Sequence, residues 1–322
     1  MDFALDDTQQ ELRRLAADLL AREAGEDQLR EAGLLGVCLP EEVGGAGLGA
    51  VEMAVVLREV GARALPALPV LAASLAITRY GTREQQARLG QARVSTVALK
   101  EPGRAPADPP ETRALYSGGW TLTGRKCAVP YGAVADVAVV SAAEGLFLAR
   151  PDVVTPEFAS TGEPLATLVF DRTPAEKIAD DAGGALLIYM TAVAAQAGGV
   201  LAGALELTKD YIKTRKQFGR SLAEFQAVTM QIADVYIASR ALDVAMWSAA
   251  WGVDHQGPAG DVALAAYHVS EAFTALFTCQ HLHGGLGLDV TYPLHKSFAH
   301  AKHLSHLLGG ADAQLDLIGA LA

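Results

Sequence analysis

Apolar residues recur at helical spacing through the first ninety positions of the chain. After a polar start at residues 7–11, leucines follow that would share one helix face: Leu12, Leu15, Leu19 and Leu20. A turn-rich stretch at 40–49 interrupts the pattern, and 51–60 resumes it. Its glycines have the spacing G-G-x-G-x-G without a strand–helix–strand unit, which favours an interhelical loop over a dinucleotide fingerprint. The pattern predicts a helical domain over residues 1–92.

From residue 93 to 182 the pattern changes to short runs rich in β-branched residues, separated by clusters of Pro and Gly. Such runs predict a small, mainly antiparallel sheet domain. Beyond 183 the chain reads as helical to its end, with apolar residues three and four positions apart: Phe225, Val228, Ile232 and Val235. The expected fold class is mainly α with a small β domain: an N-terminal helical domain, a middle β domain over 93–182 and a C-terminal four-helix bundle over 183–322.

Residues 185–205 are nearly free of charge and long enough to raise the question of a membrane span. They are rich in Ala and Gly rather than Leu and Ile, contain Gln196, and run directly into a charged helical continuation at 206–215. These features favour a buried helix of the bundle. We therefore expect no contact with a membrane.

Composition restricts the kinds of partner and the cellular compartment that we expect for this chain. The net charge of −11 and the pI near 5.2 argue against nucleic acid or an anionic membrane as the main partner, because both require a basic surface. Three widely separated cysteines suggest neither a disulfide framework nor a zinc ribbon: Cys38, Cys127 and Cys279. The acidic N-terminus lacks the features of a signal peptide. A cytoplasmic location is expected.

One segment carries a high density of basic and amide side chains. Residues 213–220 read K-T-R-K-Q-F-G-R and are followed by Phe225 and Gln226, at the turn between two long predicted helices. Guanidinium donors suit a diphosphate, and Gly219 permits a close backbone approach. The chemistry favours an anion site, although a basic loop with a phenylalanine can also simply hold two helices together.

A second segment places glycines at a helix end. Residues 281–288 read H-L-H-G-G-L-G-L, and Tyr292-Pro293-Leu294 and another helical stretch follow. Glycines allow a backbone to lie against a flat or anionic ligand, but they are equally ordinary at helix C-termini. The two segments together indicate a ligand site more strongly than either does alone.

The order R-x-x-F-G, then F-Q, a G-G-x-G and Y-P-L resembles the acyl-CoA dehydrogenase family over essentially the whole chain. The resemblance implies FAD as the cofactor, with the flavin ring belonging to a neighbouring subunit. His281 occupies the place of the family's glutamine, with Gln280 one position earlier. The residues that the resemblance assigns to the ADP half of FAD are Arg215, Gln217, Phe218, Gln226, His281, Gly284 and Gly285.

The β domain matches the family at 99–103 and 119–126 but departs from it where the chemistry lies. Residues 104–108 lack the serine that the family places near the thioester. Where an aromatic residue and a threonine meet the flavin ring in the family, this chain aligns Ala128 and Pro130. Alanine offers no ring, and proline has neither a hydroxyl nor an N–H. The flavin ring is not expected to rest on this subunit.

Both positions of the family's catalytic glutamate hold other residues. The C-terminal position aligns with Leu308, and the alternative on the first bundle helix aligns with Tyr189, which is a poor base at neutral pH. The resemblance therefore leaves no catalytic residue in this chain. The other acids considered for a relocated base are interpreted as helix caps or solvated charges: Asp180, Asp181, Glu206, Asp289 and Asp312.

Three histidines at i, i+3 and i+6 raise the question of a metal site: His300, His303 and His306. These positions drift around a helix and no carboxylate motif accompanies them, so we expect no metal. They are interpreted as solvated or interface histidines.

The resemblance implies a non-catalytic partner in a heteromeric acyl-CoA dehydrogenase, whose homologous sister subunit supplies the glutamate and binds the acyl-CoA. Such two-gene complexes resemble those that actinobacteria use for steroid side-chain thioesters in β-oxidation, which implies a heterotetramer with two copies of each chain. Two alternatives stay open. One is a self-sufficient homomeric dehydrogenase with a displaced carboxylate, and the other is a scaffold protein without flavin.

Overall fold

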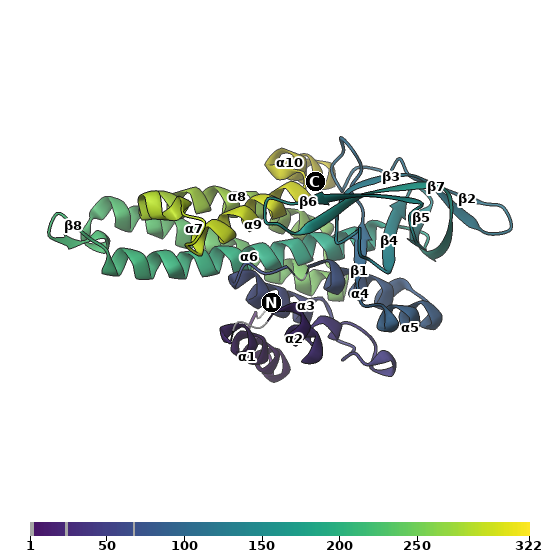
Figure 1. Ribbon diagram of the computed structural model, residues 1–322, viewed down its shortest axis with the longest axis horizontal. Coiled ribbons are helices and arrows are strands. Elements are labelled where there is room, and N and C mark those ends of the chain that lie inside the picture. The colour runs from purple at the N-terminus through teal and green to yellow at the C-terminus, as the bar shows by residue number, and fades with distance from the viewer. Residues whose placement is uncertain (1–2, 23–24, 67) are drawn as a thin grey trace.

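The computed structural model describes residues 3–22, 25–66 and 68–322, and its N-terminal part is helical (Figure 1). The first helix begins at a capping box, because the Gln9 N–H donates to Asp6 Oδ1 at 2.8 Å and the Asp6 N–H donates to Gln9 Oε1 at 3.1 Å. The helices are α1 (Asp7–Ala21), α2 (Glu26–Glu31), α3 (Ala50–Ala62), α4 (Leu68–Tyr80) and α5 (Arg83–Gln91), with 3-10 turns at Leu34–Gly36 and Glu41–Val43.

A central sheet follows the helices. Its strands lie in the order β1-β4-β5-β7-β3-β2, with β6 paired to β7, and every pairing is antiparallel except that of β1 with β4. Leu122, Phe147 and Phe170 are among the fully buried side chains of its core. The strands are β1 (Ser95–Ala98), β2 (Arg113–Tyr116), β3 (Trp120–Pro130), β4 (Val137–Ala142), β5 (Gly145–Ala149), β6 (Val153–Phe158) and β7 (Pro164–Ala179).

The C-terminal part is a bundle of long helices, with the sheet at one end and a short hairpin at the other (Figure 1). The central helix α6 contacts α3, α7, α8 and α9. These arrangements confirm the predicted fold class. The elements are α6 (Gly183–Thr214), β8 (Lys216–Gln217), β9 (Arg220–Ser221), a 3-10 turn η3 (Leu222–Glu224), α7 (Gln226–His255), α8 (Ala259–His283), a 3-10 turn η4 (Gly284–Leu288), α9 (Leu294–Leu307) and α10 (Gly310–Leu321).

Asp254, in the last turn of α7, caps the start of α3. Its carboxylate accepts the N–H of Ala50 at 2.8 Å and the N–H of Val51 at 3.1 Å. It also pairs with Arg79 of α4 at 2.6 Å. The first N–H groups of a helix have no partners within the helix, so a carboxylate there satisfies them and favours the helix dipole. Asp254 therefore fastens the N-terminal helices to the bundle.

Helices α3 and α6 pack backbone against backbone through glycines. A Cβ atom on Gly61 would lie 2.2 Å from the carbonyl oxygen of Gln196, and one on Gly203 would lie 2.3 Å from that of Ala62. On Gly199 the distance to the carbonyl oxygen of Arg58 would be 1.9 Å. The Ala- and Gly-rich composition of α6 thus has a steric cause, because any larger side chain would force the two helices apart.

Two helices are long and apolar enough to cross a membrane when judged by length and composition alone. They are Gly183–Thr214 and Ala259–Leu288. Within the fold, 83% of the apolar window of the first and 50% of that of the second are buried. The first therefore has the environment of a core helix, as its composition predicted.

Candidate functional site

The basic segment forms the β8–β9 hairpin that projects from the end of α6. Arg215 is the C-cap residue of α6, and its carbonyl accepts the Leu222 N–H at 2.9 Å. Its side chain is exposed and makes no hydrogen bond or ion pair within the described residues. Phe218 and Gly219 turn the chain with φ angles of 53° and 80°, and the Phe218 side chain is 93% exposed. The hairpin therefore presents guanidinium donors and an aromatic ring outward.

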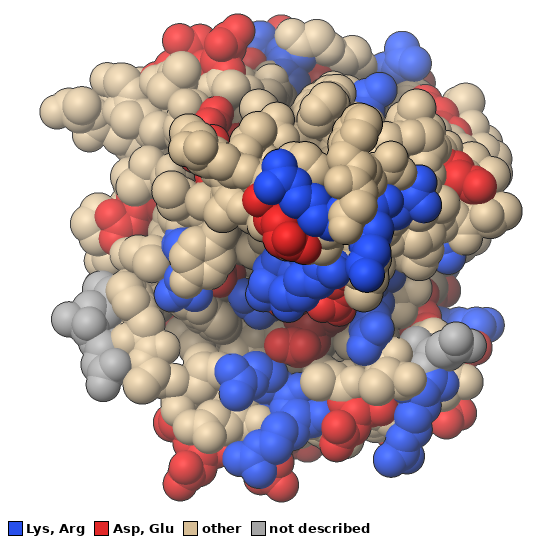
Figure 2. All heavy atoms as spheres, turned by 90° about the vertical axis from the view of Figure 1, so that its left-hand side faces the viewer, with Lys and Arg blue, Asp and Glu red and all other residues tan. Residues whose placement is uncertain are grey.

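Lys and Arg side chains gather on the end of the molecule where the hairpin lies (Figure 2). Arg220 is held there by its guanidinium, which lies 4.0 Å from the ring centroid of Phe225. Lys213 lies 3.9 Å from Asp210, whereas Lys216 has no ion-pair partner among residues 3–22, 25–66 and 68–322. A locally positive end on a protein of net charge −11 is an electrostatic feature that favours an anionic ligand.

The glycine segment is fixed to the same end of the bundle by His283. The His283 ring stacks on Tyr211 of α6 with 4.3 Å between centroids. Its Nδ1 lies 2.8 Å from the Cys279 carbonyl, which can only accept, so Nδ1 carries the proton and Nε2 accepts the Tyr292 hydroxyl at 3.2 Å. Burial lowers the pKa of His283 and keeps the ring neutral. Because Tyr211 is in the last turn of α6, the stack brings the glycines and Arg215 together.

Gly284 and Gly285 leave an open backbone surface. Gly284 has φ 60° and ψ −138°, a conformation that is strained for any other residue, and no atom lies within 4 Å of where a Cβ would be on either glycine. The Gln280 side chain donates to the Gly287 carbonyl at 3.3 Å and so braces the loop from within. His281 is exposed beside it.

Gln217 and Gln226 complete the set of residues implied at this end. Both side chains are exposed, and neither makes a hydrogen bond within the part of the chain that the structure describes. Gln226 is the first residue of α7, one position after Phe225. The structure thus brings both sequence segments to one end of the bundle. The His283, Tyr211 and Tyr292 cluster that supports them was missed by the sequence reasoning.

On the sheet, the two positions expected to face the flavin ring carry side chains without polar groups. Ala128 lies in a bulge of β3, with φ 50°, between the register positions Lys126 and Val129. Pro130 is buried, and its carbonyl accepts the Thr96 hydroxyl. Neither side chain offers a hydrogen-bond donor, and Pro130 also lacks a backbone N–H.

Both positions expected for a base are buried and lack a carboxylate. Leu308 is 1% exposed and is the C-cap residue of α9. Tyr189 is 5% exposed, and burial, followed by the nearby Glu163 carboxylate, raises the pKa of its hydroxyl. A phenol whose pKa is raised is a still poorer base at neutral pH.

The acids considered from sequence occupy capping or exposed positions. Asp181 accepts the Gly183 N–H at 2.8 Å, and Asp289 accepts the Thr291 N–H at 2.8 Å. Asp180 and Glu206 form surface ion pairs with lysines, and Asp312 lies in the first turn of α10. Their interpretation as caps and solvated charges agrees with these contacts.

Glu163 is a carboxylate that the sequence reasoning did not consider. It precedes β7, and burial raises its pKa despite a hydrogen bond from the Thr161 hydroxyl at 2.7 Å. Its Oε2 lies 3.9 Å from Nδ1 of His300 on α9. The negative charge of Glu163 also raises the pKa of Tyr189, which occupies one of the two positions expected for a base. No sequence signal marked it, because the hairpin that carries it and the helix that buries it are distant in the chain.

The expectation that all three histidines are solvated or at an interface is wrong for His300. Its side chain is 6% exposed, and Nδ1 has no hydrogen-bond partner within the described residues. Burial lowers the pKa values of both His300 and His303 to about 4. His306 is exposed. Over the part of the chain that the structure describes, no three His, Cys, Asp or Glu side chains are grouped to hold a metal ion.

The neutral His300 makes the free energy of unfolding sensitive to mild acid. Its pKa is about 4 in the fold and about 6.5 when unfolded, so its contribution is complete above pH 6.5 and is lost as the pH falls toward 4. We expect the His300 contribution to the free energy of unfolding to fall by about 2 kcal/mol between pH 7 and pH 5. Urea unfolding of the wild type and His300→Gln at both pH values measures it. The raised pKa of Glu163 acts in the opposite sense in both proteins, so identical pH slopes would contradict the assignment.

Known proteins match this chain over nearly its whole length. The family model "Acyl-CoA dehydrogenase, N-terminal domain" matches residues 4–95, and "Acyl-CoA dehydrogenase, C-terminal domain" matches residues 184–321. The chain is similar to acyl-CoA dehydrogenase FadE28 of Mycobacterium tuberculosis, with 36% identity over 99% of this chain and 98% of that protein. FadE27 of the same organism is 33% identical over 91% of this chain and 86% of that protein.

Solved structures give the same result. A variant of the Tcur3481-Tcur3483 steroid ACAD has a TM-score of 0.91 and 36% identity, covering 98% of this chain and 97% of that chain. The ChsE4-ChsE5 complex from Mycobacterium tuberculosis has a TM-score of 0.88 and 32% identity, covering 99% of this chain and 98% of that chain. By sequence and by fold, this chain belongs to the acyl-CoA dehydrogenase family.

Proposed function

We propose that this chain is the non-catalytic subunit of a heteromeric acyl-CoA dehydrogenase and supplies the ADP-binding half of a flavin site to a homologous catalytic subunit. Members of the family bind FAD. The observation that carries the proposal is the contrast between the two halves. The hairpin end keeps unengaged donors and an open glycine backbone, whereas Leu308 and Tyr189 stand where the family's base would be.

The residues at the hairpin end fit the ADP half of FAD. The Arg215 guanidinium has all its N–H donors available for a diphosphate, and the backbone at Gly284 and Gly285 has room for a close approach. The exposed side chains that complete the set are those of Gln217, Phe218, Gln226 and His281. The bound flavin supplies the acceptor for the substrate's β-hydride. In this proposal the chain holds and orients the cofactor, and the partner's glutamate takes the α-proton.

The acyl-CoA is proposed to bind at the partner's site. A cavity of about 220 Å³ adjoins the loop that the family places near the thioester, and it is lined by Asp108, Asp180 and Asp181. Three carboxylates give this cavity a negative charge, which disfavours an anionic ligand. The ChsE4-ChsE5 and Tcur3481-Tcur3483 relatives each have two components, which supports a heteromer, and the second is a steroid ACAD, which supports a steroid side-chain thioester. We extend the proposal to two copies of each chain, acting in β-oxidation in the cytoplasm.

The test compares the chain alone with the chain co-expressed with the product of an adjacent dehydrogenase-like gene. We expect flavin absorbance and acyl-CoA oxidation only in the complex. In that complex, Arg215→Ala should lower bound flavin and turnover about 10-fold or more, because a charge-assisted diphosphate contact is lost. Arg14→Ala, an exposed arginine of α1, is the matched control. Full flavin and full activity in the lone chain would overturn the proposal.

Glu163 is the candidate base for the alternative function, a self-sufficient dehydrogenase with a relocated base. Burial raises the pKa of its carboxyl, and its charge acts on Tyr189 at one of the two positions expected for the base. In that case the lone chain would oxidise acyl-CoA and Glu163→Gln would abolish turnover. A flavin-free preparation even with the partner present would instead favour the scaffold alternative.

A further inference from the structure

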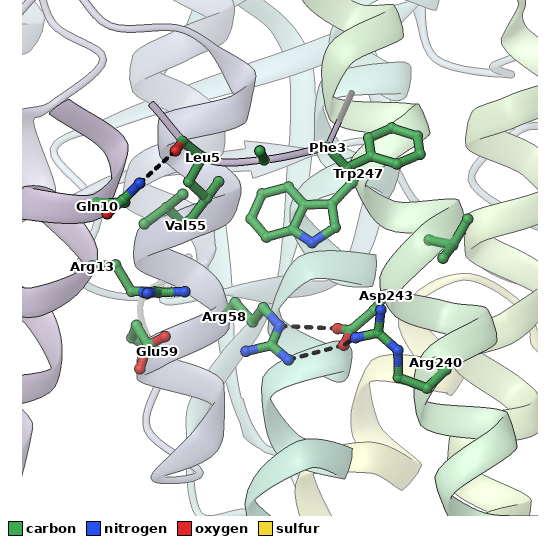
Figure 3. Close-up of a pocket in the computed structure, with 12 residues that line it drawn as sticks. Phe3, Leu5, Gln10, Arg13, Val55, Arg58, Glu59, Arg240, Asp243 and Trp247 are labelled. Atoms are coloured by element: carbon green, nitrogen blue, oxygen red, sulfur yellow. Dashed lines mark hydrogen bonds and ion pairs between the residues drawn. The ribbon is translucent and has the colours of Figure 1, made fainter. Parts of the chain in front are cut away.

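A cavity of about 510 Å³ lies between α1, α3 and α7, bordered by the N-terminal segment at residues 3–5 (Figure 3). Its size is within the range of small-molecule sites. None of the residues proposed to hold FAD lines it. Its chemistry is therefore separate from that of the hairpin end.

One wall of the cavity is a buried carboxylate shared by two arginines. Arg58 donates to Asp243 through two nitrogens, at 2.9 and 3.0 Å, and Arg240 donates to the same carboxylate at 3.3 Å. The Asp243 side chain is 5% exposed. A guanidinium has five N–H donors, so three on Arg58 and four on Arg240 remain beyond these bonds. One carboxylate cannot neutralise both cations, and this wall keeps a positive charge.

The opposite wall holds a carboxylate without a partner. Glu59 makes no hydrogen bond or ion pair within the described residues, and burial raises its pKa, opposed by Arg58 and Arg13. Figure 3 shows Glu59 and Arg13 on the side of the cavity away from Asp243. The free carboxyl can accept a hydroxyl or an amino group from a ligand.

An indole ring forms the apolar surface between these walls. Trp247 lies above the Arg58–Asp243 pair in Figure 3, beside Phe3 and Leu5. Its Nε1–H makes no hydrogen bond within residues 3–22, 25–66 and 68–322. Indole provides a large flat contact together with one donor.

We propose that this cavity binds a small hydroxylated carboxylic acid with a flat apolar body. The carboxylate meets the free N–H groups of Arg58 and Arg240, the ring packs on Trp247, and the hydroxyl donates to Glu59. Three arginines and two acids line the cavity, so the lining carries one net positive charge. This charge matches a monoanion better than a phosphate dianion. The cavity shares no residue with the proposed flavin half-site, so either proposal can fail alone.

Calorimetric titration of the full chain tests the site with 4-hydroxyphenylacetate as the probe. We expect saturable binding that weakens about 10-fold in Arg240→Ala, because a charge-assisted contact is removed while Arg58 still holds Asp243. Arg14→Ala, next to the cavity-lining Arg13 but outside the lining, should bind like the wild type. Glu59→Gln should reduce the preference for the probe over phenylacetate.

Three results would overturn the inference. They are the absence of saturable binding to the wild type, equal affinity for the wild type and Arg240→Ala, and tighter binding of phenyl phosphate than of the carboxylate. The methyl ester of the probe, which lacks the charge, should not bind. Thermal melts of each variant separate loss of binding from loss of fold, and Arg240→Lys should retain part of the affinity because it keeps the charge but not the planar fork.

Discussion

Replacing Gly199 with alanine is expected to lower the free energy of unfolding by about 3 kcal/mol or more. The new Cβ would lie 1.9 Å from the Arg58 carbonyl oxygen and 2.8 Å from the Ala62 nitrogen. Both are backbone atoms of α3, so no side-chain rotation relieves the clash and the two helices must separate. Separation would also weaken the bonds between Arg58 and Asp243, which join α3 to α7. Urea unfolding measures the loss.

The neighbouring glycine provides the control. A Cβ on Gly198 would lie 3.6 Å from Asp243 Oδ1, an ordinary contact. Alanine is favoured over glycine in a helix by about 0.5–1 kcal/mol, so Gly198→Ala should leave stability unchanged or raise it. Opposite effects from adjacent glycines of one helix would establish the backbone contact. Equal effects would show that α3 and α6 do not approach as closely as described.

The same helix shows how far the sequence specifies the fold. Composition was enough to predict that residues 185–205 are a buried helix, because a nearly charge-free stretch rich in Ala and Gly with a charged helical continuation is a local property. They do not identify the surface that buries it. The contact of Gly199 with α3 joins segments more than a hundred residues apart, and such a pairing leaves no periodic signal in a single sequence.

At the candidate site, too, some side chains could be identified from the sequence and others could not. Arg215 and Gly284 were identifiable because each lies in a dense local pattern of residue types. The stack of Tyr211 on His283 spans 72 residues and was not identifiable. His300 was misjudged because polar residues on α9 suggest exposure, whereas the loop before β7 covers it and places Glu163 nearby. The flavin contact that we propose for Arg215 is tested by Arg215→Ala.

The burial of Lys126 is a second feature that could not be predicted from the sequence, because a lysine in a strand is usually exposed. Its side chain is fully buried, and Nζ donates to Glu101 Oε1 at 2.7 Å and to Ser141 Oγ at 2.9 Å. Glu101 also accepts the N–H groups of Thr112 at 2.9 Å and Glu111 at 2.6 Å. The pair thus ties β3 to the loops on either side of 104–108, the segment that lacks the serine expected from the family resemblance.

Replacing Lys126 with methionine is expected to cost about 3–5 kcal/mol at pH 7, because the Glu101 carboxylate stays buried without its cation. Burial works to raise the pKa of Glu101, but the hydrogen bonds from Lys126, Thr112 and Glu111 lower it to about 2. The contribution of Glu101 to the free energy of unfolding is therefore complete above its unfolded pKa near 4.5 and is lost as the pH falls toward 2. Without the lysine this pKa must rise, and the deficit of Lys126→Met should shrink at pH 4, where Glu101 takes up a proton. Adding Glu101→Gln should recover much of the loss at pH 7, because paired removal leaves no isolated charge. Urea unfolding of the single and double variants at both pH values measures these changes. A loss of stability that depends neither on pH nor on Glu101 would show that only packing is affected.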